Sequence, residues 1–187
     1  LGHTTHGLAL LAGYLGELER GTMTKEGDPA IIADFPAAVT WDGRRLPGPW
    51  LVERAIELAV PRARQLGTST VVIRRSHHIA CLAAYLRPVT DQGLMILLSC
   101  SDPTIASVAP QGGTSGVMTP NPFAAGWPTR GEPVLMDISM SITTNGQVKR
   151  LHAEGRSAPG KWFVRPEGEI TADPSVMFSQ PPGALLP

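Results

Sequence analysis

Apolar side chains recur every three or four residues in two stretches of the chain, which is typical of a helix with one buried face. The first stretch spans residues 8–18 and is followed by Gly21, a residue type that commonly ends helices. The second spans residues 52–63 and ends at Gly67, and Pro61 inside it predicts a kink or an interruption because proline has no N–H to donate. Two amphipathic helices are therefore expected before residue 70.

Short apolar runs, rich in β-branched residues or leucine, predict the strands. They lie at residues 30–35, 37–41, 70–73, 94–98 and 134–138. A helical pattern at residues 80–86 lies between the third and fourth runs, and these three segments together predict a βαβ unit. Both of its strands are apolar on both faces, so central positions in a covered sheet are expected. From about residue 145 onward proline and glycine are frequent and periodicity is weak, so loops are predicted there.

Composition narrows the class of protein. Of the 187 residues 42% are apolar, which suffices for a sizeable core in a folded α/β protein. Sixteen basic and sixteen acidic residues cancel, so neither a nucleic-acid partner nor an anionic membrane surface is expected. No run approaches the roughly 18 apolar residues that cross a bilayer, and a cytoplasmic protein is predicted. Cys81 and Cys100 stand in no metal or redox spacing and are predicted to be reduced and buried. The abrupt ends lead us to expect a fragment.

Histidine carries most of the candidate chemistry, because its pKa lies near neutrality. His6 stands at a predicted helix start beside Thr5, whose hydroxyl can orient the imidazole ring. Gly7 follows it and permits the close approach of a ligand. His78 follows a predicted strand end, where site-lining residues are common. For both histidines a purely structural role stays open at this point.

Two other kinds of site find less support in the sequence. His3 and His6 precede the first helix, and no Asp or Glu occurs before Glu17, so no metal site is expected. No G-x-G-x-x-G pattern follows a predicted strand, so a dinucleotide would need a cradle other than a Rossmann fold. Gly112 and Gly113 can form an anion-binding turn, although paired glycines are more often only flexible turns.

A series of short motifs occurs here in the order in which it occurs in the malate/L-lactate dehydrogenase family, which this sequence resembles along essentially its whole length. The motifs are Gly2-His3-Thr4-Thr5-His6-Gly7, Ser76-His77-His78, Ala109-Pro110-Gln111-Gly112-Gly113, Asn121-Pro122-Phe123, Asp137-Ile138-Ser139-Met140-Ser141, Gly155-Arg156 and, after Gly168, Thr171-Ala172-Asp173-Pro174. One such match would say little, whereas the ordered set is specific.

The resemblance implies an α/β fold with a mixed sheet, covering helices and a nicotinamide-binding domain that is not a Rossmann fold. Residues 1–75 would form part of the catalytic and dimerisation domain, and residues 76–187 the cofactor-binding domain, without its C-terminal completion. Relatives are homodimeric enzymes that use NADPH or NADH. They transfer a hydride between this cofactor and a small 2-oxo acid, 2-hydroxy acid or cyclic 2-imino acid.

The resemblance also assigns roles to individual residues. His6 matches the family's proton donor, which follows a hydroxyl residue that is Thr5 here, and His78 matches a second proposed acid/base. The positions at which relatives place cofactor and site-lining contacts are Ser101, Asn121, Asp137, Ile138, Ser139, Met140 and Ser141.

This sequence departs from the family's pattern near the expected site. The departures are Ile79 and Ala80 in place of phenylalanine and glycine, Pro120 in place of threonine, and Leu10 in place of an arginine that can pair with the substrate carboxylate. A desolvated carboxylate needs another cation or N–H donor, for which Arg74 and Arg75 are candidates unless they are only surface charges. The loss of this arginine leaves one alternative open, a silent binding or scaffold protein that retains the fold. A histidine-metal hydrolase is a third and less favoured alternative, suggested by the histidines alone.

Overall fold

The computed structural model describes residues 5–187, so Gly2, His3 and Thr4 of the first motif lie outside the described residues. The chain forms two compact units. Unit 1 comprises the chain up to Ile96 together with residues 125–135, and unit 2 comprises residues 97–124 and 136–187. The predicted division at residue 75 coincides with no boundary of these units, and the roles assigned to its two parts stay predictions.

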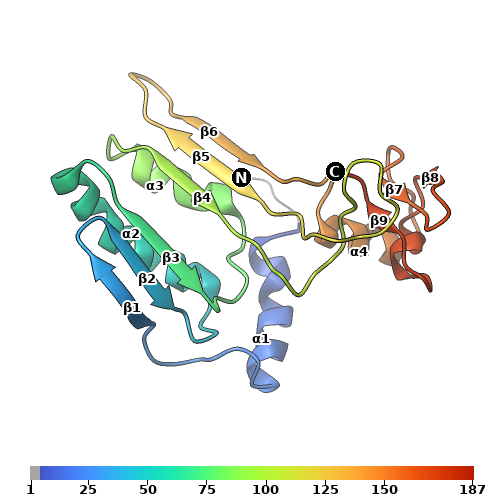
Figure 1. Cartoon of the computed structure of the whole chain (residues 1–187), viewed down its shortest axis with the longest axis horizontal. Coiled ribbons are helices and arrows are strands. Elements are labelled where there is room, and N and C mark those ends of the chain that lie inside the picture. Colours follow the sequence, from blue (N-terminus) through green and yellow to red (C-terminus); the bar gives the residue numbers. More distant parts are fainter. Residues whose placement is uncertain (1–4) are drawn as a thin grey trace. The chain divides into compact units, whose positions relative to one another are not determined.

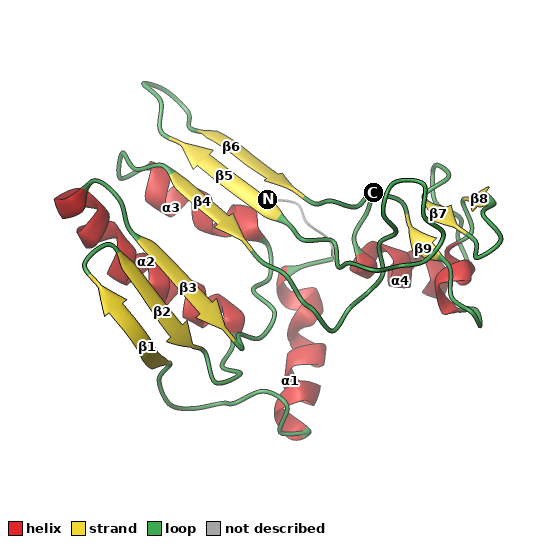
Figure 2. Ribbon diagram, in the orientation of Figure 1, coloured by secondary structure: helices red, strands yellow, loops and turns green. Residues whose placement is uncertain are grey.

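Unit 1 is built on a three-stranded sheet with the strand order β1-β2-β3. β1 (Ala30–Phe35) pairs antiparallel with β2 (Ala38–Asp42), and β2 pairs parallel with β3 (Thr70–Arg74). The connection from β2 to β3 is α2 (Gly48–Leu66), which lies along one face of the sheet (Figures 1 and 2). Because β2 and β3 are parallel and α2 connects them, β2-α2-β3 is the βαβ unit of this chain.

Both predicted helices are present in unit 1. A 3-10 turn, η1 (Gly7–Leu10), leads into α1 (Leu11–Glu19), which confirms the helix predicted at residues 8–18. α2 runs without interruption through Pro61, so the expected interruption is wrong. One proline removes a single N–H from a 19-residue helix, and the remaining hydrogen bonds and a partly buried apolar face keep the helix continuous.

The predicted βαβ unit around residues 80–86 is wrong in its pairing. Its helical part is present as η2 (Leu82–Tyr85) and α3 (Leu86–Thr90). Within residues 5–187, however, β3 ends one sheet, whereas β4 (Ile96–Ser99) ends another sheet of order β4-β5-β6. Both strands alternate between half-buried and exposed residues, so neither is central. The apolar content of a strand does not specify its hydrogen-bonded neighbour, which depends on chain topology.

The sheet β4-β5-β6 is where the chain passes from one unit to the other. β6 (Val134–Ile138) has the predicted bounds, whereas β5 (Phe123–Trp127) was not predicted. Cys81 and Cys100 form no disulfide and are half-buried, so the prediction of free thiols is confirmed and that of full burial is wrong. Among the described helices none is both long and apolar enough to span a membrane.

Unit 2 has regular structure where loops were predicted. It contains α4 (Asn145–Ala153), η3 (Pro174–Phe178) and a small sheet of order β8-β7-β9, formed by β7 (Phe163–Val164), β8 (Ile170–Thr171) and β9 (Ala184–Leu185). These elements enclose the apolar core of the unit, whose buried members are Val108, Val148, Leu151, Ala158, Phe163, Val176 and Leu185. The prediction failed because the core residues are far apart in sequence and leave no regular period.

The start of α4 does carry a sequence signal. The Thr144 hydroxyl caps the helix by accepting a hydrogen bond from the Gln147 backbone N–H at 3.1 Å. A threonine followed three residues later by glutamine is the pattern of a capping box. The pattern did not lead to the prediction of a helix, because Gly146 and the prolines and glycines after the helix are typical of loops.

Candidate functional site

Unit 1 brings the predicted catalytic residues together. The rings of His6 and His78, 72 residues apart in sequence, stack with their centroids 5.9 Å apart and their planes at 27°. Thr5 Oγ1 lies 3.0 Å from His6 Nδ1, as the pairing of hydroxyl and imidazole in the first motif predicts. Tyr14 Oη of α1 lies 2.8 Å from His78 Nδ1. The two histidines therefore form one cluster, with a hydroxyl group beside each ring.

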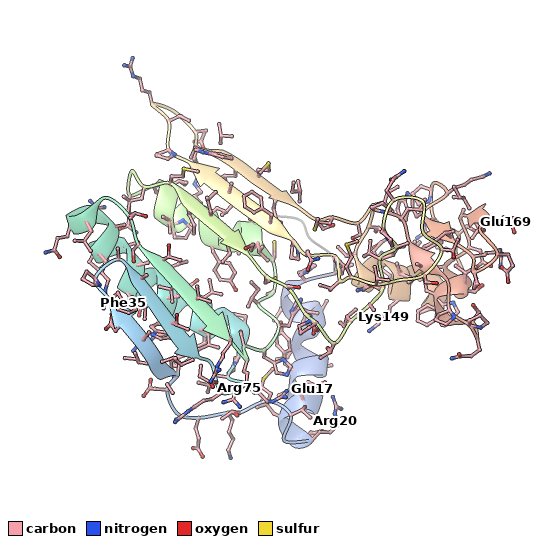
Figure 3. All side chains as sticks on the ribbon, viewed as in Figure 1. Glu17, Arg20, Phe35, Arg75, Lys149 and Glu169 are labelled. Carbon is pink, nitrogen blue, oxygen red and sulfur yellow. The ribbon has the colours of Figure 1, made fainter. Side chains whose placement is uncertain are left out.

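The loop that carries His78 is fixed by the end of β2. The carboxylate of Asp42 is almost completely buried and accepts hydrogen bonds from Arg75 Nε at 2.9 Å and from Arg74 Nη2 at 3.2 Å. The Arg44 backbone N–H donates to the same carboxylate at 2.9 Å. Hydrogen bonding to the Arg75 guanidinium, followed by that to the Arg44 amide, holds the pKa of Asp42 well below its usual value. Figure 3 labels Arg75 at this end of the sheet.

Arg75 also starts the turn from β3 into the histidine loop, because its φ of 53° is left-handed. The Arg45 N–H donates to the Arg75 carbonyl at 2.8 Å, and the His77 N–H donates to the Leu46 carbonyl at 3.2 Å. Backbone hydrogen bonds thus tie the loop to residues that follow β2. The position of His78 consequently depends on the segment between β2 and α2.

The ion pairs of Asp42 count against one predicted substrate contact. Arg75 reaches the carboxylate through both Nε and Nη2, at 2.9 and 2.5 Å, so its fork is occupied. Arg74 makes one contact of 3.2 Å, and its side chain is 64% exposed. Arg75 therefore has a structural role in unit 1, whereas Arg74 keeps donors that can face a ligand.

A third histidine and an acidic residue border the cluster. His77 packs edge-on against Tyr14, with ring centroids 6.5 Å apart, and its Nε2 lies 3.9 Å from Oε2 of Glu17 (labelled on α1 in Figure 3). Burial of its ring raises the pKa of Tyr14, so this phenol stays protonated at neutral pH. A protonated phenol donates or accepts a hydrogen bond, but it carries no charge in the site.

Unit 2 brings three of the predicted cofactor-binding segments together around Asn121. The Met140 N–H donates to the Pro120 carbonyl at 2.7 Å, and the Cys100 N–H donates to the Pro122 carbonyl at 3.3 Å. Ser101, Asn121 and the segment 137–141 consequently belong to adjoining strands and loops. Asn121 has a left-handed φ of 43°, and its buried Oδ1 has no hydrogen-bond partner among the described residues. A buried acceptor without a donor is costly in a protein, and it is satisfied when a ligand supplies an N–H or O–H.

The segment 137–141 divides into tethered and exposed positions. The Ser139 hydroxyl donates to the Ser141 carbonyl at 2.9 Å, and the Ser141 hydroxyl donates to the Thr143 carbonyl at 2.7 Å. These hydroxyls thus shape the segment internally. The apolar side chains of Ile138 and Met140, 54% and 56% exposed, are available for contact with a ring.

The negative charge of Asp137 acts on Cys100, the residue that follows β4. Burial, followed by the nearby negative charges of Asp137 and Asp102, raises the pKa of the Cys100 thiol. Cys100 therefore stays a neutral thiol at neutral pH, next to the predicted contact Ser101.

Residues 5–187 contain no group of three or more His, Cys, Asp or Glu side chains arranged to hold a metal ion. The structure adds two residues that the sequence did not single out, Tyr14 and Asp42. Tyr14 belongs to the apolar stripe of its helix, and Asp42 stands in an Asp-Gly turn dipeptide, so local rules assign both to structure. Only the folded chain places them beside His78 and its loop.

Known proteins match this chain over essentially its whole length. The sequence profile of the malate/L-lactate dehydrogenase family covers residues 1–187. The chain belongs to this family. A delta(1)-pyrroline-2-carboxylate reductase of Ancylobacter novellus is 31% identical over 98% of this chain and 52% of its own length. An L-lactate dehydrogenase of Cupriavidus necator is 31% identical over 100% of this chain and 54% of its own.

Solved structures agree with this assignment. The delta1-piperideine-2-carboxylate reductase from Pseudomonas syringae has a TM-score of 0.86 and 30% identity, over 98% of this chain and 54% of that one. A dehydrogenase from Sinorhizobium meliloti has a TM-score of 0.86 and 29% identity, over 98% and 52%. The predicted family and α/β fold class are confirmed. The chain spans about half the length of the curated relatives it matches.

Proposed function

We propose that this chain forms part of an oxidoreductase that transfers a hydride between NADPH or NADH and C2 of a small 2-oxo, 2-hydroxy or cyclic 2-imino acid. The observation that carries the proposal is the cluster of Thr5, His6, Tyr14 and His78 in unit 1. The reactions named for its relatives, on pyrroline-2-carboxylate and lactate, are of this type.

His6 is the proton donor in this proposal. When the hydride reaches C2 of a 2-oxo acid, the carbonyl π electrons move to oxygen, and this oxygen takes a proton from His6. Thr5 Oγ1, 3.0 Å from Nδ1, orients the ring. Imidazole suits the task because it exchanges protons near neutral pH.

The nicotinamide cofactor, which supplies the hydride when it is bound, fits the residues around Asn121. The buried, unpartnered Oδ1 is suited to a donor such as a carboxamide NH₂ or a ribose hydroxyl. The exposed side chains of Ile138 and Met140 offer an apolar surface. We assign cofactor contacts to Ser101, Asn121 and residues 137–141, and the acid/base chemistry to the segments around His6 and His78. The active form is a homodimer in this proposal, and light scattering of the purified protein tests that part.

The substrate carboxylate requires donors other than Arg75, whose guanidinium is bound to Asp42. Arg74 or backbone N–H groups take this role. A dicarboxylate such as oxaloacetate should be a poor substrate, because its second charge would be desolvated without a partner. A small monocarboxylic 2-oxo acid or cyclic 2-imino acid is the preferred substrate.

The first experiment replaces His6. In the intact protein, His6→Asn should lower kcat for reduction roughly 10²–10⁴-fold, the usual contribution of a general acid. His152→Asn is the matched control, because His152 stacks on Phe178 in unit 2, with ring centroids 4.3 Å apart, and has no proposed role in the reaction. A wild-type kcat in the His6 variant would show that His6 is not the donor.

Two further measurements separate substrate from cofactor. Pyruvate, oxaloacetate and piperideine-2-carboxylate are compared at equal cofactor concentration, and the highest kcat/KM for oxaloacetate would contradict the proposed charge selectivity. Asn121→Gly keeps the left-handed backbone and removes the side chain that carries the amide, so it should weaken binding of NADPH or NADH without lowering stability. A protein that does not alter the fluorescence of either nucleotide would instead be a silent member of the family.

A further inference from the structure

Two hydrogen bonds converge on one nitrogen of His78. Tyr14 Oη lies 2.8 Å from Nδ1, and the backbone nitrogen of Ala80 lies 3.3 Å from the same atom. Ala80 reaches this position through a left-handed φ of 59°, which turns its N–H back toward the ring. A backbone N–H is only ever a donor, so Nδ1 must be the acceptor in this contact.

This contact fixes the hydrogen on His78. A neutral imidazole carries one hydrogen, and if Nδ1 accepts, the hydrogen is on Nε2. The Tyr14 hydroxyl then donates to Nδ1 as well, since burial keeps the phenol protonated. Protonation of Nδ1 would place its N–H against the Ala80 N–H and reverse the bond to Tyr14. The surroundings of Nδ1 therefore favour neutral His78 over the imidazolium.

We propose that Tyr14 is a positioning residue that, with the Ala80 amide, holds His78 neutral with its hydrogen on Nε2. His78 then donates an Nε2–H hydrogen bond to the developing negative charge on the substrate, while His6 supplies the proton. These roles of His6 and His78 in the reaction rest on the proposed function, but the protonation state of His78 does not. A neutral histidine that acts as a hydrogen-bond donor is an established way to polarise a carbonyl group.

Other titratable groups lie close enough to influence the state of His78. They include His6 before η1, Tyr14 and Glu17 of α1, His77 of the same loop, Tyr85 of η2 and the thiol of Cys81, which precedes η2. The stacked ring of His6 opposes a charge on His78, because a second positive charge 5.9 Å from a protonated His6 is unfavourable. The neighbouring imidazole thus acts in the same direction as Tyr14 and Ala80.

The first test reads the hydrogen positions directly. Nitrogen-15 NMR spectra of the histidine rings, assigned with His78→Gln, distinguish protonated from unprotonated ring nitrogens. At pH 7 we expect an unprotonated Nδ1 and a protonated Nε2 for His78. A hydrogen on Nδ1, whether in the other tautomer or in the imidazolium, would overturn the proposal. This readout needs no catalysis, so it also stands if the proposed reaction is wrong.

The second test isolates the Tyr14 hydroxyl. Tyr14→Phe keeps the ring and removes the donor. As a control, Tyr85→Phe removes the hydroxyl of a buried tyrosine, which donates at 2.6 Å to the carbonyl of Ile79 in the same loop. Tyr14→Phe should raise the pH at which His78 titrates in the NMR spectra, and Tyr85→Phe should not. In the active enzyme Tyr14→Phe should lower kcat about tenfold, as the loss of one hydrogen bond predicts, with KM for the nucleotide unchanged.

The outcomes of the second test are distinct. Equal shifts in the two variants would indicate a merely structural role for both hydroxyls and would overturn the role of Tyr14. A changed titration with an unchanged kcat would keep the state of His78 but remove its part in the reaction. Absence of any nicotinamide oxidation in the wild-type protein would refute the proposed function and leave the NMR result standing.

Discussion

Gly48, the first residue of α2, is the position at which a single methyl group should damage the histidine cluster. A Cβ added to Gly48 would lie 2.3 Å from the carbonyl oxygen of His78 and 2.4 Å from that of His77. Ordinary contact begins at 3.4 Å, so the start of the helix or the histidine loop must move by about 1.1 Å. Both obstructing atoms belong to the backbone, and no side-chain rotation relieves the clash.

The displacement gives two expected magnitudes for Gly48→Ala. Overpacking of this kind typically costs about 1–3 kcal/mol of folding free energy, which urea unfolding followed by circular dichroism measures. A shift of about 1 Å in a catalytic group can reduce kcat by roughly 10²-fold, so the loss of activity should exceed what the unfolded fraction explains. The variant should therefore remain folded at 25 °C and turn over slowly.

Gly13→Ala is the matched control, because Gly13 is an interior residue of α1 and its added Cβ meets no atom within 4 Å. This change should stabilise the protein by about 0.5–1 kcal/mol through the better helix propensity of alanine. If Gly48→Ala were as stable and as active as wild type, the packing of α2 against the loop would not position His78.

Three further predictions concern stability. Asp42 has a lowered pKa in the folded state, so its stabilising effect is complete above the unfolded pKa near 3.8 and is lost as the pH falls below that value. In urea titrations at a series of pH values, the free energy of unfolding of Asp42→Asn should therefore fall less in acid than that of the wild-type protein. Phe163 is fully buried in unit 2, and Phe163→Ala should cost about 3–5 kcal/mol in calorimetry, with Phe178→Ala, half-exposed, costing less. Ala80→Gly should relieve left-handed strain of about 1–2 kcal/mol, less the backbone entropy of glycine, and a destabilised variant would contradict this.

The sequence predicts local structure well where one short segment contains the whole signal. β1 and β6 have the predicted bounds, and α1 and α2 agree with their apolar periods within a few residues. Strand pairing was mistaken, because β3 and β4 are similar apolar runs whose partners depend on distant residues. The prediction of loops in unit 2 was wrong for the same reason, since the core of this unit joins side chains from Val108 to Leu185.

The residues of the candidate site also fall into those that the sequence predicts and those that only the fold reveals. His6, Thr5 and His78 are identified by residue type and by resemblance, and the structure places them side by side. Tyr14 stands on the same helix stripe as several leucines, so its contact with His78 follows only from the packing of α1 beside the histidine loop. No local rule separates such a tyrosine from an ordinary core residue.

The residues that position the candidate chemistry share one property that sequence rules do not anticipate. Arg75, Ala80 and Asn121 are non-glycine residues with left-handed φ values of 53°, 59° and 43°. Such conformations cost of order 1–3 kcal/mol each and persist only where surrounding contacts enforce them. Asp42 binds the side chain of Arg75, and the Ala80 N–H donates to His78. Asn121 is the exception, because the buried oxygen of its side chain has no described partner to offset the strain. A ligand that donates to this oxygen would supply the contact that offsets the strain at Asn121. Cofactor binding and backbone strain at this residue should therefore be coupled.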